Sequence, residues 1–131
     1  MRFAVSVFLL PLLLAGCWRS GGTEVVAYTA LDSEFSAPIF EQFTAKNHVT
    51  VLPKYDVEST KTVGLTEAIV AERSRPRCDV FWNNEILHTL RLKRLGLLER
   101  YVPPTASDYP AEYRDPDGFW HGLAARARVL V

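Results

Sequence analysis

The chain has 131 residues, of which 48% are hydrophobic and 23% are charged. This composition is typical of a globular protein and excludes a disordered, collagen-like or coiled-coil chain. Lysine and arginine total 15 and are balanced by 15 aspartates and glutamates, so there is no basic excess to hold a nucleic-acid backbone. We therefore expect one folded domain of ordinary size and no nucleic-acid partner.

The N-terminal segment has the layout of an export signal. Arg2 precedes a short hydrophobic run, which is shorter than the roughly 20 residues that a membrane-spanning helix needs. Leu14-Ala15-Gly16-Cys17 follows and resembles the bacterial lipobox, in which the cysteine is acylated. We predict a lipoprotein signal peptide over residues 1–16, lipidation at Cys17 and a lipidated tether over residues 17–23. The alternative is an ordinary signal peptide with an unmodified cysteine.

From residue 24 onwards, short apolar runs alternate with segments of helical periodicity. The apolar runs are rich in β-branched and aromatic residues and predict strands; they cover residues 24–28, 49–55 and 79–82. The periodic segments predict helices; they cover residues 35–47, 65–73 and 86–95. Tyr28 lies within the first strand, where a core position is more typical of tyrosine than a role as a phenolate ligand.

Single residues indicate where the helices begin and end. Ser36 with Pro38 close behind indicates the start of the first helix, because proline lacks an N–H that the first turn leaves unpaired. Asn47 is a plausible stop, and Gly96 suits the left-handed position after the third helix. A proline-rich connection over residues 101–118 follows.

Alternating strands and helices predict an α/β fold, with a parallel or mixed sheet that helices flank on both faces. Two further extended runs are predicted over residues 120–123 and 127–131. Since the second of these is apolar and ends the sequence, we expect the chain to be the front part of a longer protein. The alternative is a true terminus at a sheet edge.

Four segments together carry a resemblance to one family of transport proteins. They are Val25–Ala30, Cys78-Asp79-Val80-Phe81-Trp82, Leu95-Gly96-Leu97-Leu98 and the block from Arg114 to Val131. These segments resemble the substrate-binding components of ferric-iron ABC transporters, and the last is similar to the stretch that leads into the family's first hinge strand. The resemblance implies a periplasmic-binding-protein-like (class II) fold, with residues 24–131 as the N-terminal lobe and the chain truncated before the second lobe.

The resemblance also implies a function. A member of this family is exported and held at the periplasm or cell surface, here through a lipid anchor. It captures ferric iron with a synergistic anion such as carbonate and delivers it to an ABC permease and its ATPase. We expect no organic cofactor and no enzymatic activity, since the sequence lacks Gly-x-Ser-x-Gly, His-Glu-x-x-His and a phosphate-binding glycine-rich loop. The alternatives are capture of a small anionic solute such as a phosphonate, and an isolated, inactive lobe.

Two of the segments expected at the ligand site follow predicted strands. Ligands of open α/β sheets bind beyond the carboxyl ends of the strands, where Asp32, Ser33, Asn84 and Glu85 should lie. Carboxylates are hard ligands suited to Fe(III), so Asp32 and Glu85 are the predicted metal ligands. Iron-binding relatives often place a histidine or tyrosine near Asp32, and this difference leaves an alternative. In that alternative, Asp32 or Ser33 caps the helix after the first strand. Asn83 or Asn84 likewise caps the helix after the third strand, and Glu85 interacts with the dipole of that same helix.

The third segment contains Arg126 and Arg128. In a strand, residues two apart face the same side, so both guanidinium groups would project together and favour an anion between them. The resemblance implies that this anion is the synergistic carbonate or an anionic substrate. The alternative is a solvated strand face, or salt bridges to the second lobe.

Overall fold

The computed structural model describes residues 22–56 and 62–124. The predictions for the signal peptide, for lipidation at Cys17, for the pair Arg126 and Arg128, and for the last extended run lie outside the described residues. None of the helices within the two described stretches is long and apolar enough to cross a membrane.

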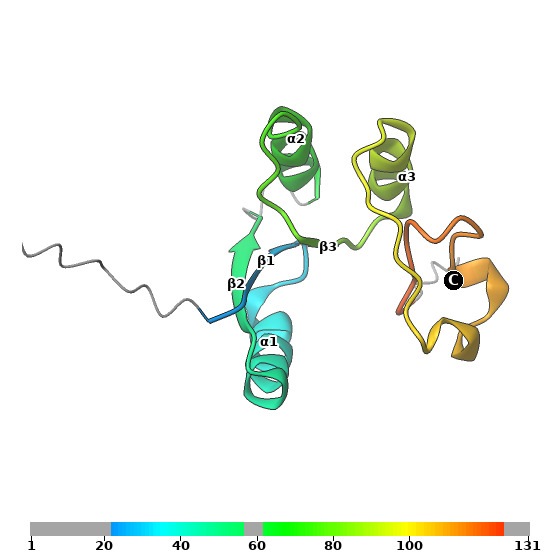
Figure 1. The fold of residues 1–131 in the computed structure, drawn as a ribbon. Helices are drawn as coiled ribbons and strands as arrows, with labels where there is room; N and C mark the ends of the chain where they lie inside the picture. Colours follow the sequence, from blue (N-terminus) through cyan, green and yellow to red (C-terminus); the bar gives the residue numbers. More distant parts are fainter. Residues whose placement is uncertain (1–21, 57–61, 125–131) are drawn as a thin grey trace, which may run out of the picture.

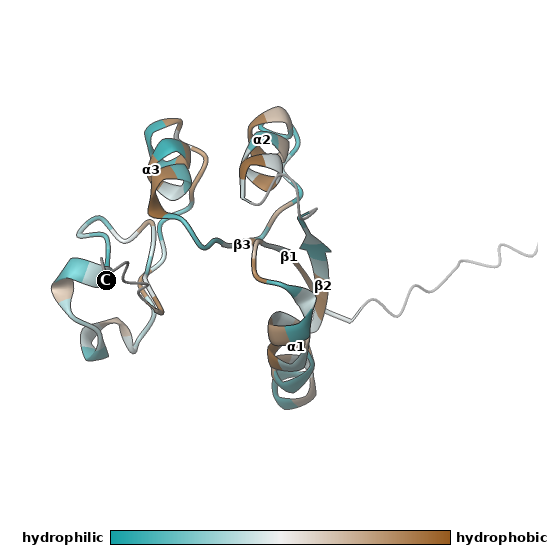
Figure 2. Ribbon diagram, turned by 180° about the vertical axis from the view of Figure 1, so that it is seen from behind, coloured by the Kyte–Doolittle hydropathy of each residue, from teal (hydrophilic) through white to brown (hydrophobic). Residues whose placement is uncertain are grey.

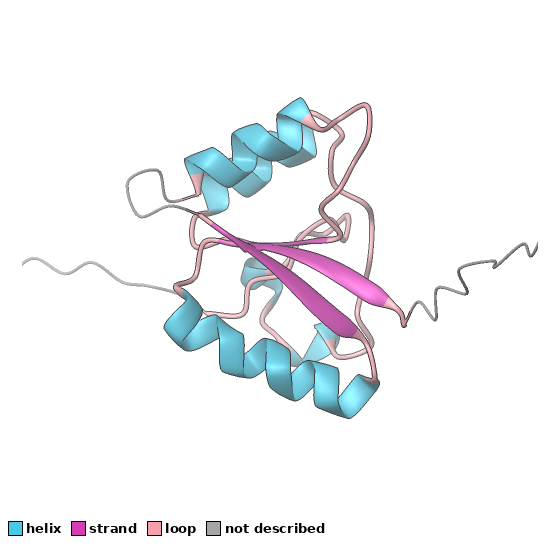
Figure 3. Ribbon diagram, turned by 90° about the vertical axis from the view of Figure 1, so that its left-hand side faces the viewer, coloured by secondary structure: helices cyan, strands magenta, loops and turns pink. Residues whose placement is uncertain are grey.

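A parallel sheet forms the centre of the molecule (Figure 3). Strand β1 (Glu24–Thr29) lies between β2 (Thr50–Tyr55) and β3 (Val80–Trp82). The three strands agree with the predicted ones to within one residue at each end. Because all three are parallel, their carboxyl ends lie at one edge of the sheet.

The register fixes which residues meet at that edge. Thr29 is paired with Tyr55 on one side and with Trp82 on the other. The backbone N–H of Asp56 donates to the carbonyl of Thr29 over 3.4 Å, and that of Ala30 donates to the carbonyl of Trp82 over 2.9 Å. The segments that leave the three strands are therefore held side by side.

Helices cover both faces of the sheet, as predicted (Figures 1 and 3). Helix α1 (Ser33–Asn47) lies on one face and contacts β2. Helices α2 (Val63–Ala71) and α3 (Ile86–Arg94) lie on the other face and pack against each other.

The predicted start of α1 at Ser36 is wrong, because the helix begins at Ser33. The carbonyl of Asp32 accepts hydrogen bonds from the backbone N–H groups of Phe35 and Ser36, over 3.0 and 3.1 Å, so the first turn forms directly after the loop that leaves β1. Pro38 lies inside the helix, where its ring removes one backbone hydrogen bond near the N-terminal end.

The predicted ends of α1 and α3 are confirmed. Helix α1 ends at Asn47, and His48 adopts a left-handed backbone with φ 56°. Gly96 has φ 66° after α3, and its N–H donates to the carbonyl of Lys93 over 3.0 Å. These contacts satisfy carbonyls that the last turn of a helix leaves unpaired.

The apolar residues of α1, coloured brown in Figure 2, are only partly buried. Phe35, Ile39 and Phe43 are 59%, 49% and 46% exposed. Phe40 makes an edge-to-face contact with Trp82, with 5.8 Å between the ring centroids. The periodicity therefore predicted the helix correctly, although the described residues bury little of its apolar stripe.

The connection after α3 contains two short 3-10 helices, η1 (Ala106–Asp108) and η2 (Ala111–Tyr113), and lies beside α3 (Figure 1). The extended run predicted over residues 120–123 is wrong, since only one antiparallel bridge forms there, between Arg114 and His121. The residues that precede Arg114 form the 3-10 helix η2, so the antiparallel pairing does not extend beyond this bridge into a ladder.

An ion-pair cluster attaches this connection to α3. The Lys93 ammonium lies 2.7 Å from Asp115 Oδ1 and 2.8 Å from Asp117 Oδ2. The backbone N–H of Phe119 donates to Asp115 Oδ2 over 3.0 Å. Burial by itself would raise the pKa of Asp115, but the hydrogen bonds from Lys93 and from the Phe119 N–H outweigh it, and the pKa lies below its ordinary value.

The direction of this shift predicts how stability depends on pH. Because the folded state lowers the pKa of Asp115, the contribution of this carboxylate is fully present above about pH 4 and is lost as the pH falls. We expect the difference in free energy of unfolding between the wild type and Asp115→Asn to shrink as the pH falls from 7 to about 3. Urea denaturation at several pH values measures it, and a difference independent of pH would contradict the ion-pair assignment.

Candidate functional site

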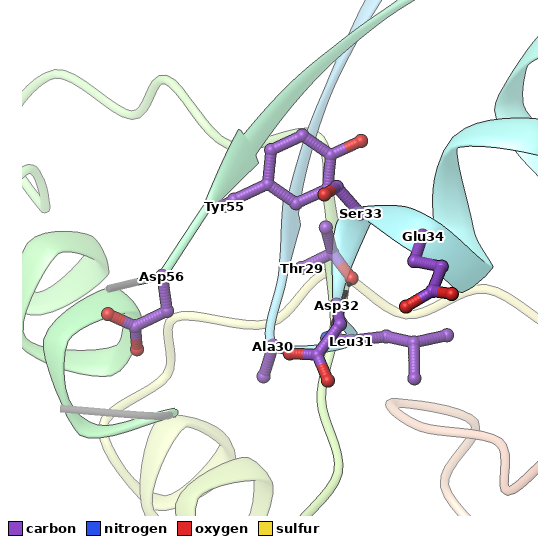
Figure 4. A pocket seen from close by; sticks show the side chains of 8 residues that line it. All are labelled: Thr29, Ala30, Leu31, Asp32, Ser33, Glu34, Tyr55 and Asp56. Atoms are coloured by element: carbon purple, nitrogen blue, oxygen red, sulfur yellow. Dashed lines mark hydrogen bonds between the residues drawn. The ribbon is translucent and has the colours of Figure 1, made fainter. Parts of the chain in front are cut away.

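A pocket of about 420 Å³ opens beyond the carboxyl ends of β1 and β2, at the N-terminus of α1 (Figure 4). Its lining comes from the loop after β1, the first turn of α1 and the end of β2. The lining residues are Thr29, Ala30, Leu31, Asp32, Ser33, Glu34, Tyr55 and Asp56. This is the edge of the sheet where the sequence predicts the ligand site.

Two predicted site residues, Asp32 and Ser33, line this pocket. Asp32 occupies the N-cap position of α1, but its side chain does not cap the helix. Figure 4 shows its carboxylate between those of Asp56 and Glu34 in this view. The position agrees with the capping alternative, whereas the side-chain geometry leaves the carboxylate directed to the pocket.

The segment after β3 contains the predicted site residues Asn84 and Glu85, and neither is among the residues that line the pocket. Asn84 Nδ2 donates a hydrogen bond of 3.0 Å to the carbonyl of Ala30, so this side chain contacts the backbone of the pocket loop. Glu85 occupies the N-cap position of α3 and is exposed, outside the set of residues that line the pocket. Asn83 supports that helix start, because its Oδ1 accepts from the Glu85 N–H over 2.9 Å. The roles of Asn84 and Glu85 as ligands stay predictions.

Sequence reasoning missed Tyr55 and Asp56, which line the pocket from the end of β2. The signal was present, because Tyr55 ends a predicted strand and Asp56 follows it directly. What was missing was the order of the strands, which puts β2 directly beside β1. Glu34, in the first turn of α1, was also missed.

The charge of the lining favours a cation. Asp32, Glu34 and Asp56 contribute three carboxyl groups, and none of the lining residues is lysine, arginine or histidine. The N-terminus of α1 adds only about half a positive charge. In the described part of the chain, however, no three His, Cys, Asp or Glu side chains are close enough together to hold a metal ion by themselves. A complete coordination shell therefore needs further donors.

A polar cluster on the sheet lies one residue before the pocket in β1. The hydroxyl of buried Tyr28 donates to the Glu72 carboxylate, at 3.0 and 2.8 Å from its two oxygens, and the Lys54 ammonium lies 4.2 Å from the centre of the ring. Burial, followed by the hydrogen bond to Glu72, raises the pKa of Tyr28. Tyr28 is therefore a protonated core residue, as predicted, and lies outside the pocket lining.

Comparison with known sequences finds a transport protein. The chain is 26% identical over 133 residues to a Sinorhizobium fredii protein named "Probable ABC transporter periplasmic-binding protein". The match covers 100% of this chain but only 35% of the relative. No protein-family model matches the sequence.

Several solved structures are similar. Iron-bound HitA from Pseudomonas aeruginosa has a TM-score of 0.64 and 22% identity, over 73% of this chain and 30% of that protein. Ferric iron-binding protein A of Mannheimia haemolytica, in an open conformation, has a TM-score of 0.66 and 20% identity. The match covers 77% of this chain and 31% of that protein. Trichodesmium IdiA (FutA), in complex with iron and citrate, has a TM-score of 0.65 and 22% identity. The match covers 76% of this chain and 30% of that protein. The chain therefore has the α/β fold of periplasmic-binding-protein-like iron-binding proteins, over a share of their length expected for one lobe.

Proposed function

We propose that this chain is the N-terminal lobe of the substrate-binding component of an ABC importer and that it helps to capture ferric iron. The observation that carries the proposal is the pocket at the carboxyl ends of β1 and β2, with its three carboxyl groups and no basic side chain. Fe(III) is a hard cation that prefers oxygen ligands. The relatives support the same class of cargo, because those with solved structures are iron-binding proteins by name.

In this proposal, Asp32 is the principal donor from the loop after β1. Asp56 and the phenol of Tyr55 are available as oxygen donors across the pocket. Glu85 and Ser33 are proposed as further ligands, and Arg126 and Arg128 as the residues that hold a synergistic anion such as carbonate. Oxygen donors from the anion and from a second lobe complete the coordination shell.

The wider assignment follows from the length of the relatives. Since the chain spans 30% to 35% of the relatives described above, we propose that residues 24–131 are one lobe of a two-lobe protein. Residues 1–16 are proposed as a signal peptide and Cys17 as a lipid attachment site, which would hold the protein at the outer side of a membrane. Its partners would be the permease and the ATPase of the importer, and its role would be transport rather than catalysis.

Titration with ferric citrate tests the proposal. We expect added iron to raise the melting temperature of the chain, and Asp32→Asn to weaken iron binding by about tenfold, because one charged ligand is lost. Asp108→Asn is the matched control, since Asp108 is exposed in η1 and lies outside the pocket lining. It should bind iron as the wild type does.

Two results would count against this function. One is a wild-type chain that gives no response to iron; the other is an equal loss of affinity in both asparagine variants. A thermal shift with methylphosphonate and none with iron would instead support the anionic-solute alternative.

A further inference from the structure

The loop that carries Asp32 has its backbone fixed by side chains from three places in the fold. The hydroxyl of Thr29 accepts a hydrogen bond from the Leu31 N–H over 3.1 Å. The hydroxyl of Ser36, in α1, lies 3.2 Å from the carbonyl of Leu31 and 3.0 Å from that of Asp32. The amide of Asn84, after β3, donates to the carbonyl of Ala30 over 3.0 Å.

Burial strengthens the contacts made by Thr29 and Ser36, whereas the side chain of Asn84 is exposed and its hydrogen bond to Ala30 is half-buried. Thr29 and Ser36 are 1% and 0% exposed, and Ala30 is 7% exposed. A hydrogen bond shielded from water is costly to break, because the separated donor and acceptor cannot pair with solvent instead. These contacts together favour the conformation of the loop that the structure shows.

Asn84 differs from the other two residues because it comes from a different part of the chain. Its own segment is held on the α3 side, where Asn83 Nδ2 donates to Thr89 Oγ1 over 3.0 Å. Asn84 thus ties the loop after β1 to the loop after β3, beyond the last backbone hydrogen bond between them, from Ala30 to Trp82.

We propose that Asn84 is a positioning residue, which holds the loop so that the Asp32 carboxylate faces the pocket. This role rests on the proposed capture of iron. A ligand held in place by a neighbour loses less freedom on binding, so the neighbour contributes to affinity without contacting the metal. Residues that orient metal ligands change metal affinity by roughly 10-fold to 100-fold when they are replaced.

The test compares Asn84→Ala with Asn47→Ala in the full chain. Asn47 is a matched control because its Nδ2 also donates to a backbone carbonyl, that of Phe43, over 2.9 Å, at the opposite end of α1. We expect Asn84→Ala to weaken ferric binding by about 10-fold, with a change in melting temperature no larger than that of Asn47→Ala. Amide hydrogen exchange at Leu31 should be faster in Asn84→Ala alone.

A double variant separates positioning from a general structural effect. If Asn84 acts through Asp32, Asn84→Ala should have little further effect on iron affinity in the Asp32→Asn background. Full additivity of the two losses, or unchanged exchange at Leu31 in Asn84→Ala, would overturn the positioning role. If the wild-type chain does not bind iron, the proposed function is overturned instead. The positioning role toward iron is then overturned with it, whatever the hydrogen-exchange result.

Discussion

Replacing Leu92 with alanine is expected to lower the free energy of unfolding by about 3 kcal/mol. The Leu92 side chain is 0% exposed in α3, where it is one of the largest fully buried side chains of the described residues. Truncation removes its apolar contacts and leaves a cavity that neighbouring side chains fill only in part. A chain of this size has a small free energy of unfolding, usually about 5–15 kcal/mol, so a loss of about 3 kcal/mol is a large share of it.

Urea denaturation of Leu92→Ala beside Leu87→Ala measures this effect. Leu87 is in the same helix but is 71% exposed, so its truncation should change the free energy of unfolding by no more than about 0.5 kcal/mol. Equal losses in the two variants would mean that α3 does not bury the face that the structure assigns to it.

Gly118→Ala is expected to lower the free energy of unfolding by about 2 kcal/mol. Gly118 has φ 80°, a left-handed conformation that costs an L-residue roughly 1–2 kcal/mol. A Cβ at this position would also lie 2.7 Å from Val102 Cγ2, so the exposed Val102 side chain must shift. The strain would act on a turn in which the Gly118 N–H donates to the carbonyl of Asp115 over 3.0 Å.

Gly96→Ala separates the two causes. Gly96 has φ 66°, yet a Cβ there would meet nothing within 4 Å, so its substitution should cost about 1 kcal/mol from the backbone conformation alone. Thermal unfolding of both variants measures the difference. If Gly118→Ala is no more destabilising than Gly96→Ala, the close contact with Val102 carries no cost.

Local sequence patterns predicted the elements well where one residue type dominates. The apolar runs located β1, β2 and β3 to within one residue, because Ala27, Tyr28 and the strands beside them form the centre of the sheet. Gly96 was predicted correctly since the left-handed region restricts the choice of residue. The start of α1 was missed because Pro38, the strongest local signal, lies inside the helix rather than in its first turn.

The site was predictable only in part because it is assembled from distant segments. Asp32 and Ser33 were found because they lie in the short segment between a predicted strand and the next helix. Tyr55 and Asp56 were missed because their place beside Asp32 depends on the order β2-β1-β3, which no local pattern specifies. The hydrogen bond from Asn84 to Ala30 is likewise a product of the sheet register and is invisible in either segment alone.

The position of bound iron tests the central claim most directly. Crystals of the chain grown with ferric citrate, measured at the iron absorption edge, would give an anomalous peak at each ordered iron. The account predicts a peak in the pocket beside Asp32, on the side that faces Asp56 and Tyr55. Iron that binds in solution but gives its peak away from this pocket would contradict it.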